Sequence, residues 1–364
     1  MRQRPGSDQN RGHRGAEMNI AVLDFERWDS GITSYALAAA EGLKNKGHKI
    51  IFVGLEGKPP ADSAEKRGVK TAWFSSAASI FDLMKLISAE GIECLNPHDG
   101  RSHMLCAMAK ILTKARPRLV RTYADARPVG KHGYLWNTTD AFIAAAEFIK
   151  DDFVNKGLPP GKINVVRQGM DMNFTDSAVP AKLAGKHNVS IVGRLDPVKG
   201  HETFIKAAAI VAMSFPDVFF YVIGGEKNVK INQLKAFAEK HAVGNIVFTG
   251  FADDAGSYMR ASDIGVIASS GSEAVSRVAA EWMACGKPLV ATTAGCLSEL
   301  VEDGVSGLIV APDDPAAMAV AIERLLKDDS ARISMGRAAA ERAEDMFDPV
   351  KFAESTEKIL KGDL

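Results

Sequence analysis

The chain of 364 residues lacks several features that would place it in a specialised class of protein. It has no uninterrupted apolar run of the ~18 residues that a membrane-spanning helix needs. Its four cysteines show no Cys-x-x-Cys or Cys/His ligand spacing, which argues against a zinc site and favours reduced thiols in a cytoplasmic protein. The GxxxxGK[ST] loop and the GxGxxG fingerprint are both missing, which excludes two common nucleotide-binding motifs.

Charge is balanced over the whole chain but not along it. The formal net charge is zero and the pI is about 7.1, so nothing points to a nucleic-acid partner. The segment 110–131, however, holds seven basic residues and a single acid, Asp125. This segment predicts either a basic face for an anionic lipid or acceptor, or an ordinary solvated stretch.

Short apolar segments alternate with longer segments of helical period along most of the chain. Strands this apolar are typical of parallel sheets covered on both faces, so we expect an α/β fold with two doubly wound sheets. Strands are expected at 19–24, 49–54, 69–74, 92–97, 118–123, 140–145, 162–167, 188–193, 218–224, 245–250, 263–269, 288–292 and 307–312, and helices include 32–47, 104–115, 202–214, 231–242, 275–285, 315–327 and 348–361.

The alternation predicts two Rossmann-like domains. We expect an N-terminal domain over 18–172 and a C-terminal domain over 188–345, joined by a hinge over 173–187. A disordered polar tail over 1–17 and a final helix over 346–364, packed back on the N-terminal domain, complete the expected organisation. Open α/β sheets bind ligands at the carboxyl ends of their strands, so a cleft between the domains is the expected site.

Two glutamates, Glu273 and Glu281, lie in the segment SGSEAVSRVAAEWMACGKPLVAT. On one ideal helix they would be separated by roughly 800° of rotation and ~12 Å of rise, so they could not share a proton or a metal. If Glu273 lies in the loop and Glu281 one or two turns along the helix, both could contact an elongated ligand such as a nucleotide sugar. The alternative is a first-turn acid favoured by the helix dipole and a solvated helix residue.

A second informative segment is IVGRLDPVKGHE, residues 191–202, which is typical of a strand, a loop and a helix start. Loop amides and a helix N-terminus form an anion site, and Arg194 and Lys199 add two positive charges across the turn. This arrangement favours a diphosphate ligand. The alternative is a pair of solvated surface charges.

Together these two segments resemble glycosyltransferase family 4, a group of retaining enzymes with the GT-B fold. GRLDPVKG matches the family's G-R-L-x-x-x-K-G motif, and Glu273 and Glu281 match its E-x7-E motif. Residues 292–319 resemble the block that follows in the family, and VVRQGMDMNF (165–174) resembles the closing segment of its N-terminal domain. The resemblance is strong over 188–345 and weaker over 18–175.

The resemblance implies that the N-terminal domain binds the acceptor and the C-terminal domain binds the donor, and it implies roles for the matched positions. Arg194 and Lys199 would hold the donor diphosphate and stabilise the leaving charge. Glu281 would bind the ribose hydroxyls, and Glu273 would contact the donor sugar near the reacting carbon. The catalytic candidates are therefore Glu273, Arg194 and Lys199, and Gly31 joins the donor-binding set because it falls on the family's glycine-rich loop after the first strand. A plain helix start is the alternative for Gly31.

The sequence departs from the family at two places. Glu273-Ala-Val-Ser replaces the usual Glu-Gly-Phe-Gly, and Ala124 stands about where the family often has a histidine. His98 and Asp99 lie at another strand end and resemble a second N-domain motif of the family. The alternative for His98 is a buried histidine or a turn residue. Candidates for the acceptor side are Ser30, His98, Arg101, Tyr123, Asp125 and Arg127.

The family implies transfer of a sugar from a nucleotide-diphospho-sugar to a glycan or glycolipid hydroxyl, without a metal or other cofactor. The absence of a D-x-D triplet is in line with GT-B enzymes, which neutralise the leaving diphosphate with cationic side chains. Base recognition is expected near Thr249–Ala252. The segment 120–129 and the basic residues around it favour cell-envelope glycan or lipopolysaccharide synthesis, in a cytoplasmic protein that contacts the inner face of the plasma membrane. The alternatives are a transferase for a soluble acceptor and a non-catalytic nucleotide-sugar-binding protein.

Overall fold

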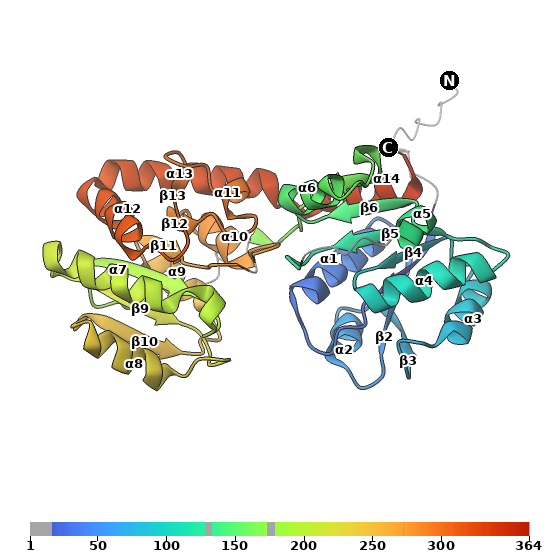
Figure 1. Ribbon diagram of the computed structural model, residues 1–364, viewed down its shortest axis with the longest axis horizontal. Coiled ribbons are helices and arrows are strands. Elements are labelled where there is room, and N and C mark those ends of the chain that lie inside the picture. The colour runs from blue at the N-terminus through green and yellow to red at the C-terminus, as the bar shows by residue number, and fades with distance from the viewer. Residues whose placement is uncertain (1–16, 128–132, 173–178, 272, 364) are drawn as a thin grey trace, which may run out of the picture. The chain divides into compact units, whose positions relative to one another are not determined.

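The computed structural model describes residues 17–127, 133–172, 179–271 and 273–363. Two parallel sheets of seven and six strands alternate with helices, which confirms the predicted doubly wound α/β architecture (Figure 1). The chain divides into two compact units: the first holds the described residues up to Thr122, Gly133–Ala141 and the residues from Thr356 on, and the second holds the rest. In the described part of the chain, no helix is both long enough and apolar enough to cross a bilayer.

The first sheet has the strand order β3-β2-β1-β4-β5-β6-β7. The order reverses at β1, which pairs in parallel with β2 on one side and β4 on the other. Such a reversal leaves a crevice at the carboxyl ends of the two central strands, where α/β sheets bind ligands. The elements are β1 (Asn19–Leu23), α1 (Gly31–Asn45), β2 (Lys49–Leu55), α2 (Pro59–Lys66), β3 (Lys70–Phe74), α3 (Ile80–Glu90), β4 (Cys94–Pro97), α4 (Gly100–Leu112), β5 (Arg118–Tyr123), α5 (Gly133–Thr138), β6 (Ala141–Ala144), α6 (Glu147–Asn155) and β7 (Ile163–Val165).

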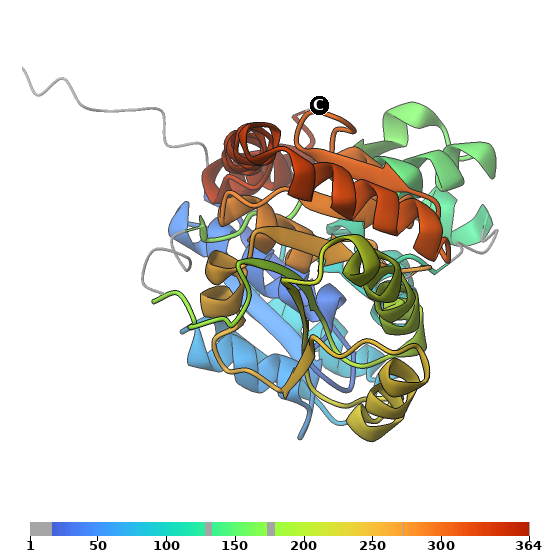
Figure 2. The same cartoon turned by 90° about the vertical axis from the view of Figure 1, so that its left-hand side faces the viewer.

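The second sheet has the order β10-β9-β8-β11-β12-β13, with the same kind of reversal at β8. Helix α7 packs against both α8 and α12, and Figure 2 shows these helices together on one side of the strands. The elements are β8 (His187–Val192), the 3₁₀ turn η3 (Pro197–Lys199), α7 (His201–Ser214), β9 (Val218–Ile223), α8 (Ile231–Lys240), β10 (Ile246–Gly250), α9 (Ala255–Ala261), β11 (Ile264–Ile267), α10 (Arg277–Ala284), β12 (Leu289–Thr292), α11 (Leu297–Leu300), β13 (Gly307–Val310), α12 (Pro315–Lys327), α13 (Asp329–Met346) and α14 (Pro349–Lys361).

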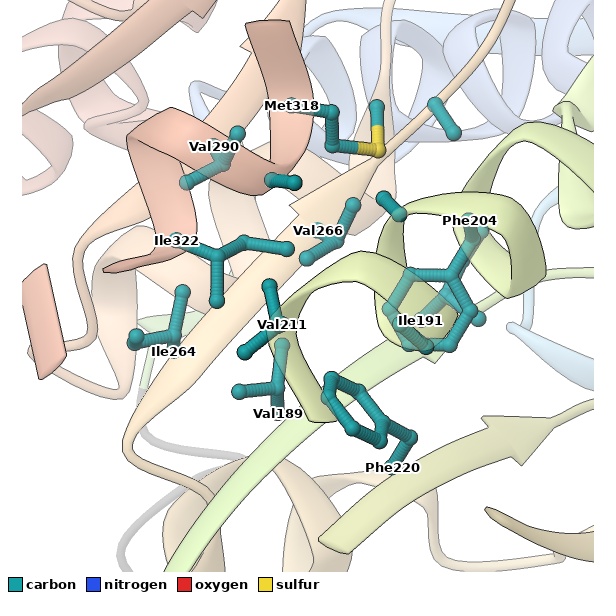
Figure 3. Packing of buried hydrophobic residues seen from close by; sticks show 14 of the residues in the cluster. Val189, Ile191, Phe204, Val211, Phe220, Ile264, Val266, Val290, Met318 and Ile322 are labelled. Atoms are coloured by element: carbon teal, nitrogen blue, oxygen red, sulfur yellow. The ribbon is translucent and has the colours of Figure 1, made fainter. Parts of the chain in front are cut away.

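The core of the second unit lies between this sheet and helices α7 and α12 (Figure 3). Ile191 of β8 and Val266 of β11 project from the central strands toward Phe204 of α7 and Met318 of α12, and all four side chains are at most 2% exposed. A close-packed layer of this kind holds the strand ends in place, because a dense core has few voids and low compressibility. The loops that follow β8 and β11 therefore start from rigid supports.

All thirteen predicted strands are present, each within two residues of its expected bounds. Two predicted helix starts were wrong. Helix α4 begins at Gly100 rather than residue 104, because the Asp99 carboxylate accepts hydrogen bonds from the backbone amides of Arg101 and Ser102 and caps it. Helix α10 begins at Arg277 rather than residue 275, because Ser276 has a left-handed backbone with φ of 41°.

Some of the sequence predictions fall on residues outside the described ranges. These are the tail up to residue 16, residues 173–178 of the hinge, and residues 128–132, which include Lys131 of the basic segment.

Candidate donor site

The loop between β8 and α7 carries the predicted diphosphate-binding residues. It closes with η3 and with Gly200, whose φ is +70°. A Cβ atom on Gly200 would lie 2.0 Å from the Ala268 carbonyl oxygen, so only glycine fits at this position. The Asp196 carboxylate accepts a hydrogen bond from the Val198 amide at 3.3 Å and fixes the turn that precedes Lys199.

Glu273 and Lys199, predicted from separate motifs, form an ion pair. The Lys199 Nζ atom donates to Glu273 Oε1 at 2.5 Å, across 74 residues of sequence. The Glu273 side chain is only 5% exposed, and its Oε1 also accepts a hydrogen bond from the Ser269 hydroxyl at 2.6 Å. Because a buried carboxyl group is costly without a partner, the Lys199 ammonium and the Ser269 hydroxyl account for an acid in this buried position.

The backbone around Glu273 is held as closely as its side chain. The Cys296 amide donates to the Glu273 carbonyl oxygen at 2.8 Å. Gly295 has φ of +57°, and a Cβ atom there would lie 2.1 Å from the same oxygen. The turn before α11 therefore packs directly against the loop that contains Glu273.

Glu281 lies in the second turn of α10, while Glu273 lies in the loop before it, as the spacing predicted. Arg277 donates to Glu281 Oε1 at 3.2 Å. Burial raises the pKa of the Glu281 carboxyl, and the Arg277 guanidinium opposes that shift. Arg277 lies one helical turn before Glu281, so it is placed to keep this half-buried acid ionised.

Arg194 is presented differently from Lys199. Its side chain is 54% exposed, and its Nε atom lies 3.8 Å from an Asp196 carboxylate oxygen. At that distance and exposure the pair adds little to stability. The guanidinium therefore remains available to a ligand at the surface of the loop.

Two neighbours of this site were not predicted as site residues. Ser269, at the end of β11, supplies the second hydrogen bond to Glu273, and its position at a strand end was the available signal. His201, the first residue of α7, is 3% exposed, and burial lowers its pKa to about 4. A neutral imidazole thus lies behind the loop that carries Lys199.

The first half of the chain places its candidates mainly in structural roles. Ser30 caps α1, because its hydroxyl accepts a hydrogen bond from the Thr33 amide at 3.2 Å. Gly31 is the first residue of α1, and a Cβ atom at this position would meet no neighbouring group of the described chain within 4 Å. Open space at a helix start would let a ligand approach the backbone.

His98 is fully buried at the end of β4. Its Nε2 atom lies 2.9 Å from Asn96 Oδ1, and burial holds the pKa of the imidazole well below its usual value. Next to it, Asp99 caps α4 and also accepts a hydrogen bond from the Phe25 amide at 2.8 Å. In this structure His98 is therefore a neutral core side chain, in line with the alternative drawn from the sequence.

The remaining candidates are spread over different environments. Tyr123, at the end of β5, packs edge-on against Phe153 with ring centroids 4.5 Å apart. Asp125 and Arg127 pair with each other at 2.9 Å. Arg101 is exposed in the first turn of α4.

With this geometry in place, two family models match successive parts of the chain. Residues 30–174 match the model described as Glycosyltransferase Family 4, and residues 186–328 match the model described as Glycosyl transferases group 1. The second match contains Arg194, Lys199, Glu273 and Glu281. The chain belongs to glycosyltransferase family 4.

Among curated relatives, the chain is 29% identical over 255 residues to a D-inositol 3-phosphate glycosyltransferase of Pseudarthrobacter chlorophenolicus, covering 67% of this chain and 60% of that protein. It is 32% identical over 195 residues to the protein of the same name from Paenarthrobacter aurescens, covering 50% of this chain and 48% of that one. The chain thus matches about half the length of these relatives.

Among solved structures, the chain is similar to HepE of Anabaena in complex with UDP. The TM-score is 0.83 at 20% identity, and the match covers 95% of this chain and 100% of HepE. At this identity the likeness shows the fold, and it confirms the GT-B architecture expected from the sequence.

Proposed function

We propose that this protein is a retaining, metal-independent glycosyltransferase that moves a sugar from a nucleotide-diphospho-sugar to a hydroxyl acceptor. The observation that carries the proposal is the ion pair between Lys199 and Glu273 at 2.5 Å. It joins the two motifs that define the family's donor site, and it places a cation and an acid side by side at adjacent strand ends. In such a pair the cation would bind the diphosphate and the acid would bind a sugar hydroxyl.

The chemistry follows from these positions. The donor diphosphate binds Arg194, Lys199 and the amides at the N-terminus of α7, which stabilise the charge that develops as the nucleoside diphosphate leaves. Once Lys199 turns to phosphate, the Glu273 carboxylate is free to accept hydrogen bonds from the sugar. Glu281 accepts hydrogen bonds from the ribose hydroxyls. The acceptor hydroxyl attacks the oxocarbenium-like sugar from the face the diphosphate leaves, and its proton passes to a phosphate oxygen.

The donor and acceptor are proposed by class. HepE has been solved with UDP and with UDP-glucose, which supports a uridine diphosphate sugar as the first donor to test. The curated relatives carry the name of an inositol phosphate as acceptor, so a cyclitol phosphate is a reasonable soluble test acceptor. For the physiological acceptor we propose a glycan or glycolipid of the cell envelope, such as a lipopolysaccharide precursor.

The first experiment measures donor binding by calorimetry with UDP, GDP and ADP. Arg194→Ala should weaken binding of the preferred diphosphate about tenfold, because a charge-assisted contact is lost. Arg337→Ala, which removes another exposed arginine, in helix α13, is the matched control and should leave affinity unchanged. Equal affinity of both variants and the wild type would remove the diphosphate assignment.

The second experiment measures turnover of the preferred donor with and without EDTA, and the anomeric configuration of the product by NMR. We expect EDTA-resistant transfer or slow hydrolysis with retention of configuration. Loss of activity in EDTA that returns with a divalent cation would overturn the metal-independent part. Tight nucleotide binding with neither transfer nor hydrolysis of any donor would favour the non-catalytic binding protein instead.

A further inference from the structure

Helix α4 in the first unit exposes an apolar face. Its outward side chains Met104, Met108, Ile111 and Leu112 are 46%, 44%, 48% and 58% exposed. Spacings of three and four residues place them along one side of the helix. The inward side packs into the core of the first unit through Leu105, Cys106, Ala107 and Ala109.

The two helices next to α4 also expose large apolar side chains. Helix α4 contacts both α3 and α5, and Figure 1 shows the three helices as neighbours. Phe81 of α3 is 81% exposed and Tyr134 of α5 is 63% exposed. Single exposed apolar side chains are ordinary, but several large ones on one helix and its two neighbours favour an interaction site. We call Met104, Met108, Ile111 and Leu112 with Phe81 and Tyr134 the α4 surface.

The described part of the basic segment 110–131, which begins in the last turn of α4, does not form the continuous basic face that its sequence allowed. Lys110 pairs with Asp140 at 2.5 Å. Arg118 is turned toward the C-terminal helix, where its guanidinium donates to the Ile359 carbonyl oxygen at 3.3 Å. Arg121 is 2% exposed and belongs to the core. These three side chains interact within the first unit, so they are not available to bind an anionic partner.

Three described cations of this segment are exposed: Lys114, Arg116 and Arg127, and Arg127 pairs with Asp125. Within the described ranges neither Lys114 nor Arg116 makes an ion pair. They line an open hollow of about 540 Å³ whose other lining residues include Ile87, Pro117 and a single acid, Glu93. The hollow adjoins the C-terminal end of α4, so the apolar side chains end beside two unpaired positive charges.

We propose that the α4 surface docks on an anionic lipid membrane. The apolar side chains would enter the interfacial layer while Lys114 and Arg116 contact phosphate headgroups, which is how interfacial helices combine burial with charge. A two-fold dimer through the same surface fits less well, because it would bring the cations of both copies to one interface. The inference goes beyond the proposed transfer reaction and depends on none of the donor-site residues.

The test is co-sedimentation of the full chain with phosphatidylcholine vesicles, with and without phosphatidylglycerol. The wild type should bind only the anionic vesicles, and added salt should weaken that binding. The double variants Met108→Ser/Ile111→Ser and Lys114→Gln/Arg116→Gln should each bind at least about tenfold more weakly, since each removes one of the two contributions. The matched control is Met213→Ser/Ile333→Ser, which changes two apolar side chains in the second unit that are 79% and 62% exposed, and it should bind like the wild type.

Three outcomes would overturn the proposal. One is equal binding of neutral and anionic vesicles, and another is wild-type binding by both α4 variants. The third is a wild-type dimer in analytical ultracentrifugation that Met108→Ser/Ile111→Ser separates, with no vesicle binding, which would make the surface an interface between copies. Nucleotide binding by calorimetry, measured on every variant, reports whether it is folded and keeps failure of docking distinct from failure of the donor site.

Discussion

Each half of the chain buries an acid close to the carboxyl end of a central strand, and two of these acids, Glu273 and Asp24, are stabilised in different ways. Glu273, in the loop after β11, is paired with Lys199 at 2.5 Å. Asp24, directly after β1, is bonded by the Thr33 hydroxyl at 2.6 Å and the Glu26 amide at 3.1 Å, and burial raises its pKa to about 7. A cation pairs with the first acid, while burial favours the neutral form of the second.

The two sheets have similar topology, but the electrostatic environments of their buried acids differ. Both sheets reverse their strand order beside these acids, and both loops lead into a helix. In the second half Lys199, from a neighbouring loop, pairs with Glu273, so a positive charge lies where a ligand could bind it. In the first half the acids Asp99 and Glu26 add to the effect of burial and also raise the pKa of Asp24.

The largest expected effect concerns Asp24→Asn. An acid whose pKa is higher in the folded than in the unfolded protein contributes its full stabilisation at pH values below its unfolded-state pKa. For Asp24 that contribution falls as the pH rises from about 4 to about 7. A rise in the Asp24 pKa from 3.8 to about 7 corresponds to at most about 4 kcal/mol. Urea unfolding at several pH values should therefore show a smaller loss of stability between pH 4 and 7 in Asp24→Asn than in the wild type.

The control for that series is Asp82→Asn, which changes an exposed acid in α3 and should keep the wild-type pH dependence. If Asp24→Asn keeps that dependence as well, Asp24 is ionised in the folded protein and the contrast with Glu273 is wrong.

The next effect is on the paired acid. Lys199→Met leaves the Glu273 carboxylate buried with the Ser269 hydroxyl alone, which should lower the free energy of unfolding by roughly 2–3 kcal/mol, at the lower end for a broken buried pair because Lys199 is partly exposed. The double variant Lys199→Met/Glu273→Gln should recover most of that stability. Donor turnover should stay low in both, which separates the structural role from the functional one. Additive losses in the double variant would show that the two side chains are not coupled.

A smaller effect distinguishes the two serines that precede helices at these loops. Ser30 has an extended backbone and caps α1, whereas Ser276 has φ of 41° and makes no capping bond. Ser30→Ala should therefore cost about 1 kcal/mol. Ser276→Gly should stabilise the protein by roughly 0.5–1 kcal/mol, because glycine accepts a left-handed backbone without strain.

Thermal unfolding of Ser276→Gly and Ser276→Ala completes that test. The alanine variant keeps the strained backbone and should be no more stable than the wild type. A glycine variant that is also no more stable would mean that the Ser276 backbone is not strained.

The smallest expected effect on stability is that of Arg277→Met. This exposed side chain contributes little to folding, but it lies 3.2 Å from Glu281 and opposes the rise in the pKa of that carboxyl. Loss of Arg277 should move the low-pH limit of nucleotide binding to higher pH, with less than about 0.5 kcal/mol change in the free energy of unfolding. An unchanged pH profile would show that Glu281 is not ionised by Arg277 or does not bind the ligand.

Much of the fold could be predicted because its signals are local. Segments such as VFFYVIG and GLIVAP are apolar on both faces, a pattern typical of buried parallel strands, and each is found where it was expected. The GRLDPVKG loop and the E-x7-E segment were likewise visible as spacings of residue types. Helix starts were less visible, since the cap of α4 and the left-handed Ser276 depend on backbone angles that no single residue type requires.

By itself, the sequence determined the strand and helix alternation, the two sheets and the residues that match the family's donor motifs, because each of these follows from periodicity or fixed spacing over a short stretch. Only the tertiary structure decided which charges meet and which are buried. Lys199 reaches Glu273 across 74 residues, Arg118 and Arg121 turn inward, and Lys114 and Arg116 stay at the surface beside the exposed face of α4. Charge interactions act through space and depend on local burial, so no linear spacing could have separated these outcomes.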